Sequence, residues 1–183
     1  MNPAADYTIL IVDDQASNLE VLSELLEGHG FEALTARDGE TAVEIAQRAR
    51  PDLILLDVVL PGIDGFEVCL RLKAAKVTEH TPVMFMTILE KIEDKIQGFR
   101  VGAADYITKP FETEEVLARV TTQLRLRRLT RELQEANETL EQRVAERTAQ
   151  LAQVNTELQA EVVERRAAEA ALSKVNRAYR TLS

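Results

Sequence analysis

Five polar residues of this chain stand where short strand-like runs end, and together they could carry out chemistry on a phosphoryl group. They are Asp13, Asp14, Asp57, Thr87 and Lys109. Holding several ionised carboxylates close together costs free energy unless a cation lies among them. Mg²⁺ suits such a set because it prefers oxygen ligands, keeps several waters and binds through one or two carboxylates plus phosphate oxygens. A metal, acids and one lysine suit phosphoryl transfer.

Each of these residues has a predicted role in that chemistry. Asp57 attacks phosphorus, Mg²⁺ and Lys109 neutralise the phosphoryl oxygens, and the Thr87 hydroxyl donates a hydrogen bond to one of them. We expect Asp14 and Asp57 to be direct metal ligands, Asp13 to act directly or through water, and a backbone carbonyl just after Asp57 to complete the shell. A lone Asp13-Asp14 pair is more often a helix cap, so the prediction depends on all five residues.

The elements that must position these residues alternate between strand and helix. Short apolar runs predict buried parallel strands, and helical periodicity predicts the segments between them. Because the carboxyl ends of such strands share one edge of a doubly wound α/β sheet, the five polar residues would meet in one cleft. We expect five parallel strands covered by helices on both faces. The predicted strands lie near 7–12, 31–36, 53–57, 83–87 and 105–108, and the predicted helices near 17–28, 39–49, 64–74, 90–101 and from about 112 onward.

Composition and charge exclude several classes of protein. No run of about 18 apolar residues could span a membrane, and the first residues lack the regions of a signal peptide. One cysteine, Cys69, excludes an internal disulfide and fits a reducing compartment, so we expect a cytoplasmic protein. The net charge is −9, but residues 126–183 hold ten Lys and Arg against nine Asp and Glu. The acidity therefore belongs to residues 1–125, where it disfavours a nucleic-acid surface and favours a metal or a basic partner.

Four segments, in order and each at a predicted strand end, carry a resemblance to a known family. They are Ile11-Val12-Asp13-Asp14, Leu56-Asp57-Val58-Val59-Leu60-Pro61-Gly62-Ile63-Asp64-Gly65, Met86-Thr87, and Gly102-Ala103-Ala104-Asp105-Tyr106-Ile107-Thr108-Lys109-Pro110. With these segments, residues 7 to about 124 resemble the receiver domain of two-component response regulators. The resemblance implies a flavodoxin-like sheet with strand order 2-1-3-4-5.

The resemblance also implies roles for particular residues. Asp57 would be the phosphoacceptor, and the donor would be a phosphohistidine on a histidine kinase or phosphotransfer protein. Asp13, Asp14 and Asp57 would bind Mg²⁺, with the carbonyl of Val59 as a further ligand. Thr87 and Tyr106 would form a switch pair, in which Thr87 moves toward the phosphoryl group and Tyr106 turns inward behind it.

One residue departs from the family's pattern. Ile88 follows the switch threonine, where the family usually has a small residue, often Ala. A β-branched side chain there should crowd the phosphoryl site or the path of Tyr106. We therefore expect slower attack by water and a longer-lived acyl phosphate than in relatives with Ala.

The chain from Phe111 to Ser183 contains no Gly and no Pro and is rich in helix formers. Its apolar residues recur at spacings of three and four, which predicts a coiled-coil seam. A 4-4 spacing at Ala136, Leu140 and Val144 indicates a stutter. Arg147 and Arg165 fall in core positions, with Glu161 near another. The seam residues are Leu126, Leu129, Leu133, Ala136, Leu140, Val144, Leu151, Val154, Leu158, Leu172, Val175, Tyr179 and Leu182.

We divide the chain into a receiver domain, residues 1–124, and a signalling helix, residues 125–183, continuous with the last receiver helix. A long helix with one apolar stripe does not stay solitary in water, so we expect a parallel homodimer through residues 126–182. This helix resembles connectors in bacterial multidomain signalling proteins. We expect an output domain, attached beyond Ser183 or present as a partner, of the histidine kinase or diguanylate cyclase type.

Three functions follow from these features. The first is a phosphorylation switch that passes its signal through a dimeric coil to the output domain. The second is a passive dimeric scaffold whose coil geometry does not respond to phosphorylation. The third is an enzyme such as an aspartyl-phosphate phosphatase, which needs a second Asp two residues after the nucleophile, where this chain has Val59. We favour the first and expect no enzyme activity, nucleic-acid contact or membrane contact from this chain.

Overall fold

The structure is a computed structural model that describes residues 7–88, 98–110 and 112–181, apart from the side chains of residues 175 and 178–181. Its five strands form one parallel sheet in the order β2-β1-β3-β4-β5. The predicted fold class and strand order are therefore confirmed. The strands are β1 (Thr8–Val12), β2 (Glu32–Ala36), β3 (Leu53–Asp57), β4 (Val83–Thr87) and β5 (Asp105–Thr108).

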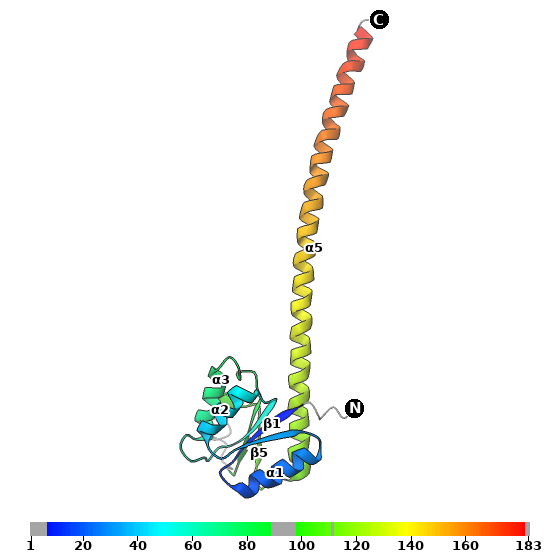
Figure 1. Ribbon diagram of the computed structural model, residues 1–183. Helices are drawn as coiled ribbons and strands as arrows, with labels where there is room; N and C mark the ends of the chain where they lie inside the picture. The colour runs from blue at the N-terminus through cyan, green and yellow to red at the C-terminus, as the bar shows by residue number, and fades with distance from the viewer. Residues whose placement is uncertain (1–6, 89–97, 111, 182–183) are drawn as a thin grey trace. The chain divides into compact units, whose positions relative to one another are not determined.

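The helices begin and end where the sequence predicts them within about two residues. They are α1 (Ala16–Gly28), α2 (Gly39–Ala49), α3 (Gly65–Ala74) and α5 (Thr113–Thr181). Figure 1 labels β1 and β5 of the sheet and the helices α1, α2, α3 and α5. Most of the helix predicted near 90–101 lies outside the described residues, although residues 98–100 are helical. Two carboxylates cap helix starts: Asp38 accepts a hydrogen bond from the backbone N–H of Thr41, and Asp64 accepts one from that of Glu67, both at 2.8 Å.

The core has two layers because alternate residues of each strand face opposite sides of the sheet. One layer packs under α1 and the first turns of α5, where Val116, Val120 and Leu124 are buried. The other packs under α2 and α3, whose buried residues include Val68 and Leu72. The central strands β1 and β3 are buried on both faces over most of their length, which explains why they are continuous apolar runs.

Arg127 extends the contact of α5 with the sheet one turn beyond the last core residue. Its guanidinium donates hydrogen bonds to the backbone carbonyls of Pro51, at 3.3 Å, and Asp52, at 2.8 Å, in the turn before β3. The carboxylate of Asp52 lies 3.8 Å from the Arg127 Nε and accepts a hydrogen bond from the backbone N–H of Thr8. One arginine therefore links α5 to the starts of β3 and β1.

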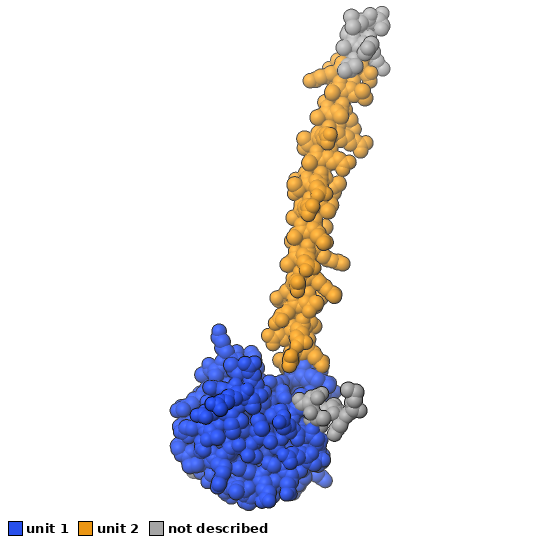
Figure 2. Space-filling model, viewed as in Figure 1, with its two compact units in different colours: residues 1–129 blue, residues 130–183 orange. Residues whose placement is uncertain are grey.

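The chain divides into two compact units, Met1–Leu129 and Thr130–Ser183 (Figure 2). The described part of the second unit is helix throughout, as predicted from its lack of Gly and Pro. Among the described residues, no helix is both long and apolar enough to cross a membrane.

Gly65, the first residue of α3, lies against the backbone of the predicted phosphoacceptor Asp57 and leaves no room for a side chain. A Cβ placed there would lie 2.3 Å from the backbone oxygen of Asp57 and 2.8 Å from the Cα of Val58. No real contact is that short, so a side chain at this position must displace the segment after β3.

We therefore predict that Gly65→Ala lowers the free energy of unfolding by about 1–3 kcal/mol. The matched control is Gly28→Ala, because a Cβ at Gly28 meets nothing within 4 Å; it should be neutral or stabilise by about 0.4–1 kcal/mol. Urea unfolding of both variants measures the difference. Equal stability of the two variants would contradict the close approach at Gly65.

Candidate functional site

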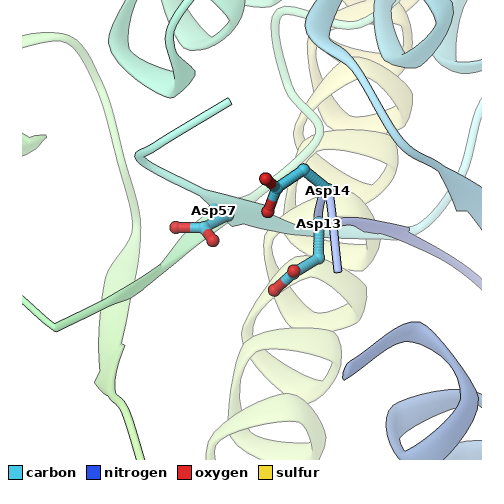
Figure 3. Close-up of side chains that lie close together, drawn as sticks. All are labelled: Asp13, Asp14 and Asp57. Carbon is cyan, nitrogen blue, oxygen red and sulfur yellow. The ribbon is translucent and has the colours of Figure 1, made fainter. Parts of the chain in front are cut away.

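The five polar residues predicted to meet do lie at one edge of the sheet. Asp57 is the last residue of β3, Thr87 is the last residue of β4, and Asp13, Asp14 and Lys109 directly follow β1 and β5. Carboxylate oxygens of the three aspartates lie within 4.8 Å of one another (Figure 3). Because all strands are parallel, their carboxyl ends share this edge.

Lys109 makes the shortest hydrogen bonds of the site. Its ammonium donates hydrogen bonds to Oδ2 of Asp13 at 2.6 Å and to Oδ2 of Asp57 at 2.5 Å. Asp13 is fully buried, and the side chains of Asp57 and Lys109 are only 8% and 12% exposed. These charges are shielded from water, so each of them depends on the others.

The environment shifts the pKa of two of these groups. Burial raises the pKa of the Asp57 carboxyl, although Lys109 and the backbone N–H of Val59 oppose the shift. Burial alone would lower the pKa of the Lys109 ammonium, but its hydrogen bonds to Asp13 and Asp57 outweigh that effect and raise it. Lys109 is therefore a permanent cation at neutral pH, held against a carboxylate that burial makes harder to ionise.

The backbone around Asp57 is held by hydrogen bonds on both sides. The side-chain oxygen Oδ1 of Asp57 accepts a hydrogen bond from the backbone N–H of Val59 at 3.2 Å. The next residue, Val58, donates its N–H to the carbonyl of Met86 at 3.4 Å and accepts a bond from the N–H of Gly65 at 2.9 Å. The predicted phosphoacceptor thus sits on a segment fixed to β4 and to the start of α3.

Asp14 has different surroundings from the other two aspartates. Asp14 is exposed, and its backbone carbonyl accepts a hydrogen bond from the side chain of Arg37 at 3.0 Å. An exposed carboxylate beside two buried ones leaves one side of the cluster open to solvent. A cation could enter from that side without displacing core residues.

The predicted switch residues lie on neighbouring strands. Thr87 is buried, and its backbone carbonyl accepts a hydrogen bond from the N–H of Lys109 at 2.7 Å. Tyr106 is half-buried in β5; its ring meets that of Phe99 edge-on, with centroids 6.0 Å apart, and Arg119 lies 5.9 Å above it. Ile88 is 67% exposed, so its side chain does not fill the core behind Thr87.

Sequence reasoning missed two polar groups near these residues. The side-chain amide of Asn18, in the first turn of α1, donates to both carboxylate oxygens of Asp13 at 3.0 Å. Arg119 binds both oxygens of Asp105 at 3.0 Å beside Tyr106. The available signals were an amide five residues after Asp13, in the first turn of the predicted helix, and an arginine next to the buried Val120 of α5, and neither is specific by itself.

The residues at the sheet edge fit a divalent cation. Hard cations take oxygen ligands, and Mg²⁺ needs only one or two carboxylates besides water. The cluster of Asp13, Asp14 and Asp57 offers three carboxylates close enough to share one ion, and one of them is open to solvent. The donor set therefore matches a magnesium site better than a zinc site, which would use His or Cys.

An acidic cluster with one lysine, at the carboxyl edge of a 2-1-3-4-5 sheet, defines a receiver-type phosphoacceptor fold. The family model described as response regulator receiver domain matches residues 9–121. The chain belongs to this family, whose receiver domains are phosphorylated on an aspartate in two-component signalling.

Individual relatives agree with this assignment. The DNA-binding dual master transcriptional regulator RpaA of Synechocystis is 48% identical over 117 residues, which cover 64% of this chain and 48% of RpaA. Response regulator PleD of Caulobacter vibrioides is 43% identical over 127 residues, which cover 69% of this chain and 28% of PleD. The chain thus spans less than half of the length of these two curated relatives.

Solved structures show the same fold. The chemotaxis response regulator CheY4 of Vibrio cholerae matches with a TM-score of 0.62 and 34% identity, covering 64% of this chain and 98% of CheY4. The BeF₃-activated N-terminal receiver domain of Klebsiella pneumoniae RstA matches with a TM-score of 0.61 and 31% identity, covering 64% of this chain and 98% of that domain.

We predict that Lys109→Met lowers the free energy of unfolding by about 3–5 kcal/mol at pH 8, because it leaves buried carboxylates without their cation. Lys109 stabilises the folded state fully at pH 8, below its ordinary pKa of 10.5, and loses this effect only above its raised pKa. At pH 5 the penalty should shrink, since Asp57, whose pKa burial already raises, takes up a proton when Lys109 is gone.

Urea unfolding without divalent ions, at both pH values, measures this effect. Lys76→Met, at an exposed lysine, is the matched control and should change little. A penalty that is equal at pH 8 and pH 5 would show that Lys109 does not act by neutralising these carboxylates.

Proposed function

We propose that Asp57 is the phosphoacceptor and that it receives a phosphoryl group from a phosphohistidine on a histidine kinase or phosphotransfer protein. The observation that supports this most is the position of its carboxylate. One oxygen is bound by Lys109 at 2.5 Å, and two further carboxylates lie beside it at the sheet edge. A cation beside a buried nucleophile is what phosphoryl transfer requires.

In the proposed reaction, a carboxylate oxygen of Asp57 forms a bond to phosphorus as the phosphorus–nitrogen bond of the phosphohistidine breaks, and the imidazole leaves. Asp14 and Asp57 would hold Mg²⁺ directly, Asp13 directly or through water, and the carbonyl of Val59 would complete the shell. The ion would neutralise charge on the phosphoryl oxygens. Lys109, already at the Asp57 carboxylate, would pair with one of those oxygens.

Thr87 and Tyr106 are the proposed switch pair. Thr87 ends the strand next to Asp57, so its hydroxyl would donate a hydrogen bond to the phosphoryl group. Tyr106 is half-buried beside Phe99 and Arg119, so its ring has room to change its packing. Ile88 directly follows Thr87 with an exposed side chain. It would shield the acyl phosphate from water and lengthen its lifetime.

The helix beyond the receiver would form a parallel homodimer through residues 126–182. The support is the exposure of the large apolar residues in the described part of this stripe, which ranges from 46% at Leu129 to 72% at Leu133 in the single chain. Burying such residues against a second copy stabilises by roughly 25 cal/mol per Å². Two shallow hollows on this helix include stripe residues, one at Ala136 and Leu140 and the other at Leu158.

The proposed domains are a receiver, residues 1–124, and a signalling helix, residues 125–183. Phosphorylation would change the register of the coil and so control an output domain, attached or separate. The chain itself would be a phosphoacceptor without enzyme activity, acting in the cytoplasm, where the single buried thiol of Cys69 stays reduced. A passive scaffold is the alternative, favoured by Arg147 and Arg165 in core positions, which limit how well the coil packs.

The phosphoacceptor is tested by incubating the chain with Mg²⁺ and acetyl phosphate and measuring the intact mass. We expect a mass gain of one phosphoryl group, lost when Mg²⁺ is chelated. Asp57→Asn should abolish the gain and Asp14→Asn should reduce it strongly. The matched control is Asp52→Asn, whose carboxylate binds Arg127 and Thr8 at the opposite edge of the sheet. Full phosphorylation of Asp57→Asn would refute this assignment.

The coil is tested by disulfide crosslinking of Leu133→Cys, a seam position, against the neighbouring Gln134→Cys, which faces outward in the same heptad. Cys69 can stay, because it is fully buried and burial raises the pKa of its thiol to about 11. We expect crosslinks at position 133 only, with a yield that changes on adding beryllofluoride. An unchanged yield would favour the passive scaffold, and equal yields at the two positions would contradict the seam.

A further inference from the structure

Asp13 is the most completely hydrogen-bonded carboxylate of the site. Its Oδ1 accepts a bond from the backbone N–H of Gln15 at 2.9 Å, and its Oδ2 accepts one from Lys109 at 2.6 Å. The amide of Asn18 donates to both oxygens at 3.0 Å. A carboxylate offers about four lone-pair positions. The Asn18 amide nitrogen shares one N–H between the two oxygens, so three protein donors occupy most of these positions, and Asp13 itself is fully buried.

The other two carboxylates are far less occupied. Asp57 accepts one bond at each oxygen, from Val59 and Lys109. The carboxylate of Asp14 is exposed and accepts no hydrogen bond from any of the described residues. Protein donors thus fix the orientation of Asp13, whereas Asp14 and Asp57 keep lone pairs for an ion.

Asn18 has the geometry of a residue that orients Asp13. Its backbone N–H donates to the carbonyl of Gln15 at 3.1 Å, while the N–H of Gln15 donates to Asp13. These bonds close a ring that joins the start of α1 to the carboxylate. The amide must present its nitrogen, because carboxylate oxygens only accept. Asn18 also adds no positive charge, so it satisfies Asp13 without repelling a cation as a second lysine would.

We propose that Asn18 is a positioning residue that holds the Asp13 carboxylate in place and thereby sets the affinity of the acidic cluster for a divalent cation. This inference rests on the proposed metal site. Groups that hydrogen-bond metal ligands fix their orientation, and losing such a group typically weakens metal binding by about 10- to 100-fold. A role limited to the start of α1 would change stability and leave the metal affinity unchanged.

The test measures Mn²⁺ binding to the full chain by the electron paramagnetic resonance signal of the free ion, followed by competition with Mg²⁺. Asn18→Leu keeps the size and removes the donor, and Asn18→Ala serves if the leucine prevents folding. We expect either variant to raise the Mn²⁺ dissociation constant on the order of tenfold. Asn18→His, whose ring N–H is the same number of bonds from the backbone, should restore most of the affinity.

Ser17→Ala is the matched control, because Ser17 is an exposed neighbour in the same turn of α1, and its affinity should not change. Urea unfolding of every variant separates stability from binding. If Asn18→Leu or Asn18→Ala binds Mn²⁺ as tightly as the unsubstituted chain, Asn18 does not position Asp13 for the metal, whatever its effect on stability. If the unsubstituted chain binds no Mn²⁺, the acidic cluster is not a metal site and the inference fails with it.

Discussion

The ammonium of Lys109 between Asp13 and Asp57 is the contact on which the site depends. In the sheet order, β1 and β3 are neighbours, and β4 separates β3 from β5, which carries Lys109. Strands lie about 4.8 Å apart, so the backbone of a residue following β5 lies roughly 10 Å from that of Asp57. Only a long side chain can bring a charged group from there to the Asp57 carboxylate. The backbone N–H of Lys109 donates a hydrogen bond to the carbonyl of Thr87 at 2.7 Å, which fixes the position of the Lys109 backbone.

This contact also explains how acids can be buried at the edge of a hydrophobic core. Without a cation, Asp13 and Asp57 would repel each other in a setting where burial already raises the pKa of Asp57. Lys109 supplies part of the missing charge, and Asn18 and Gln15 supply neutral donors to Asp13. The exposed Asp14 remains the natural entry point for a metal. These donors offset part of the charge of the acidic cluster, and the exposed Asp14 leaves one side of it open to an ion.

Much of this arrangement could be predicted from the sequence. Strands β1, β3 and β4 could be predicted within one residue because they are buried on both faces and leave continuous apolar runs. The meeting of the five polar residues could also be predicted, because the carboxyl ends of parallel strands lie at the same edge of the sheet. Asn18 and Gly65 were not predicted as part of the site, because their importance comes from tertiary distances: 3.0 Å from an amide to Asp13, and no room for a Cβ beside the Asp57 carbonyl.

The long helix could equally be predicted from its composition, and α5 runs to Thr181 without a break. Its pairing stays a prediction, because an exposed apolar stripe does not by itself identify the surface that covers it. The switch roles of Thr87 and Tyr106 depend on a second conformation. Neither the spacing of residues nor a single conformation contains that information.

Arg127 has a mechanical consequence for α5. Leu124 is buried in the core, and Arg127, about one turn later, binds the carbonyls of Pro51 and Asp52. A helix held at both levels cannot spin about its own axis while those bonds persist. Under the proposed function, a signal from the sheet edge that rotated α5 would have to break the Arg127 bonds, whereas one that tilted α5 together with the Pro51–Asp52 turn would keep them.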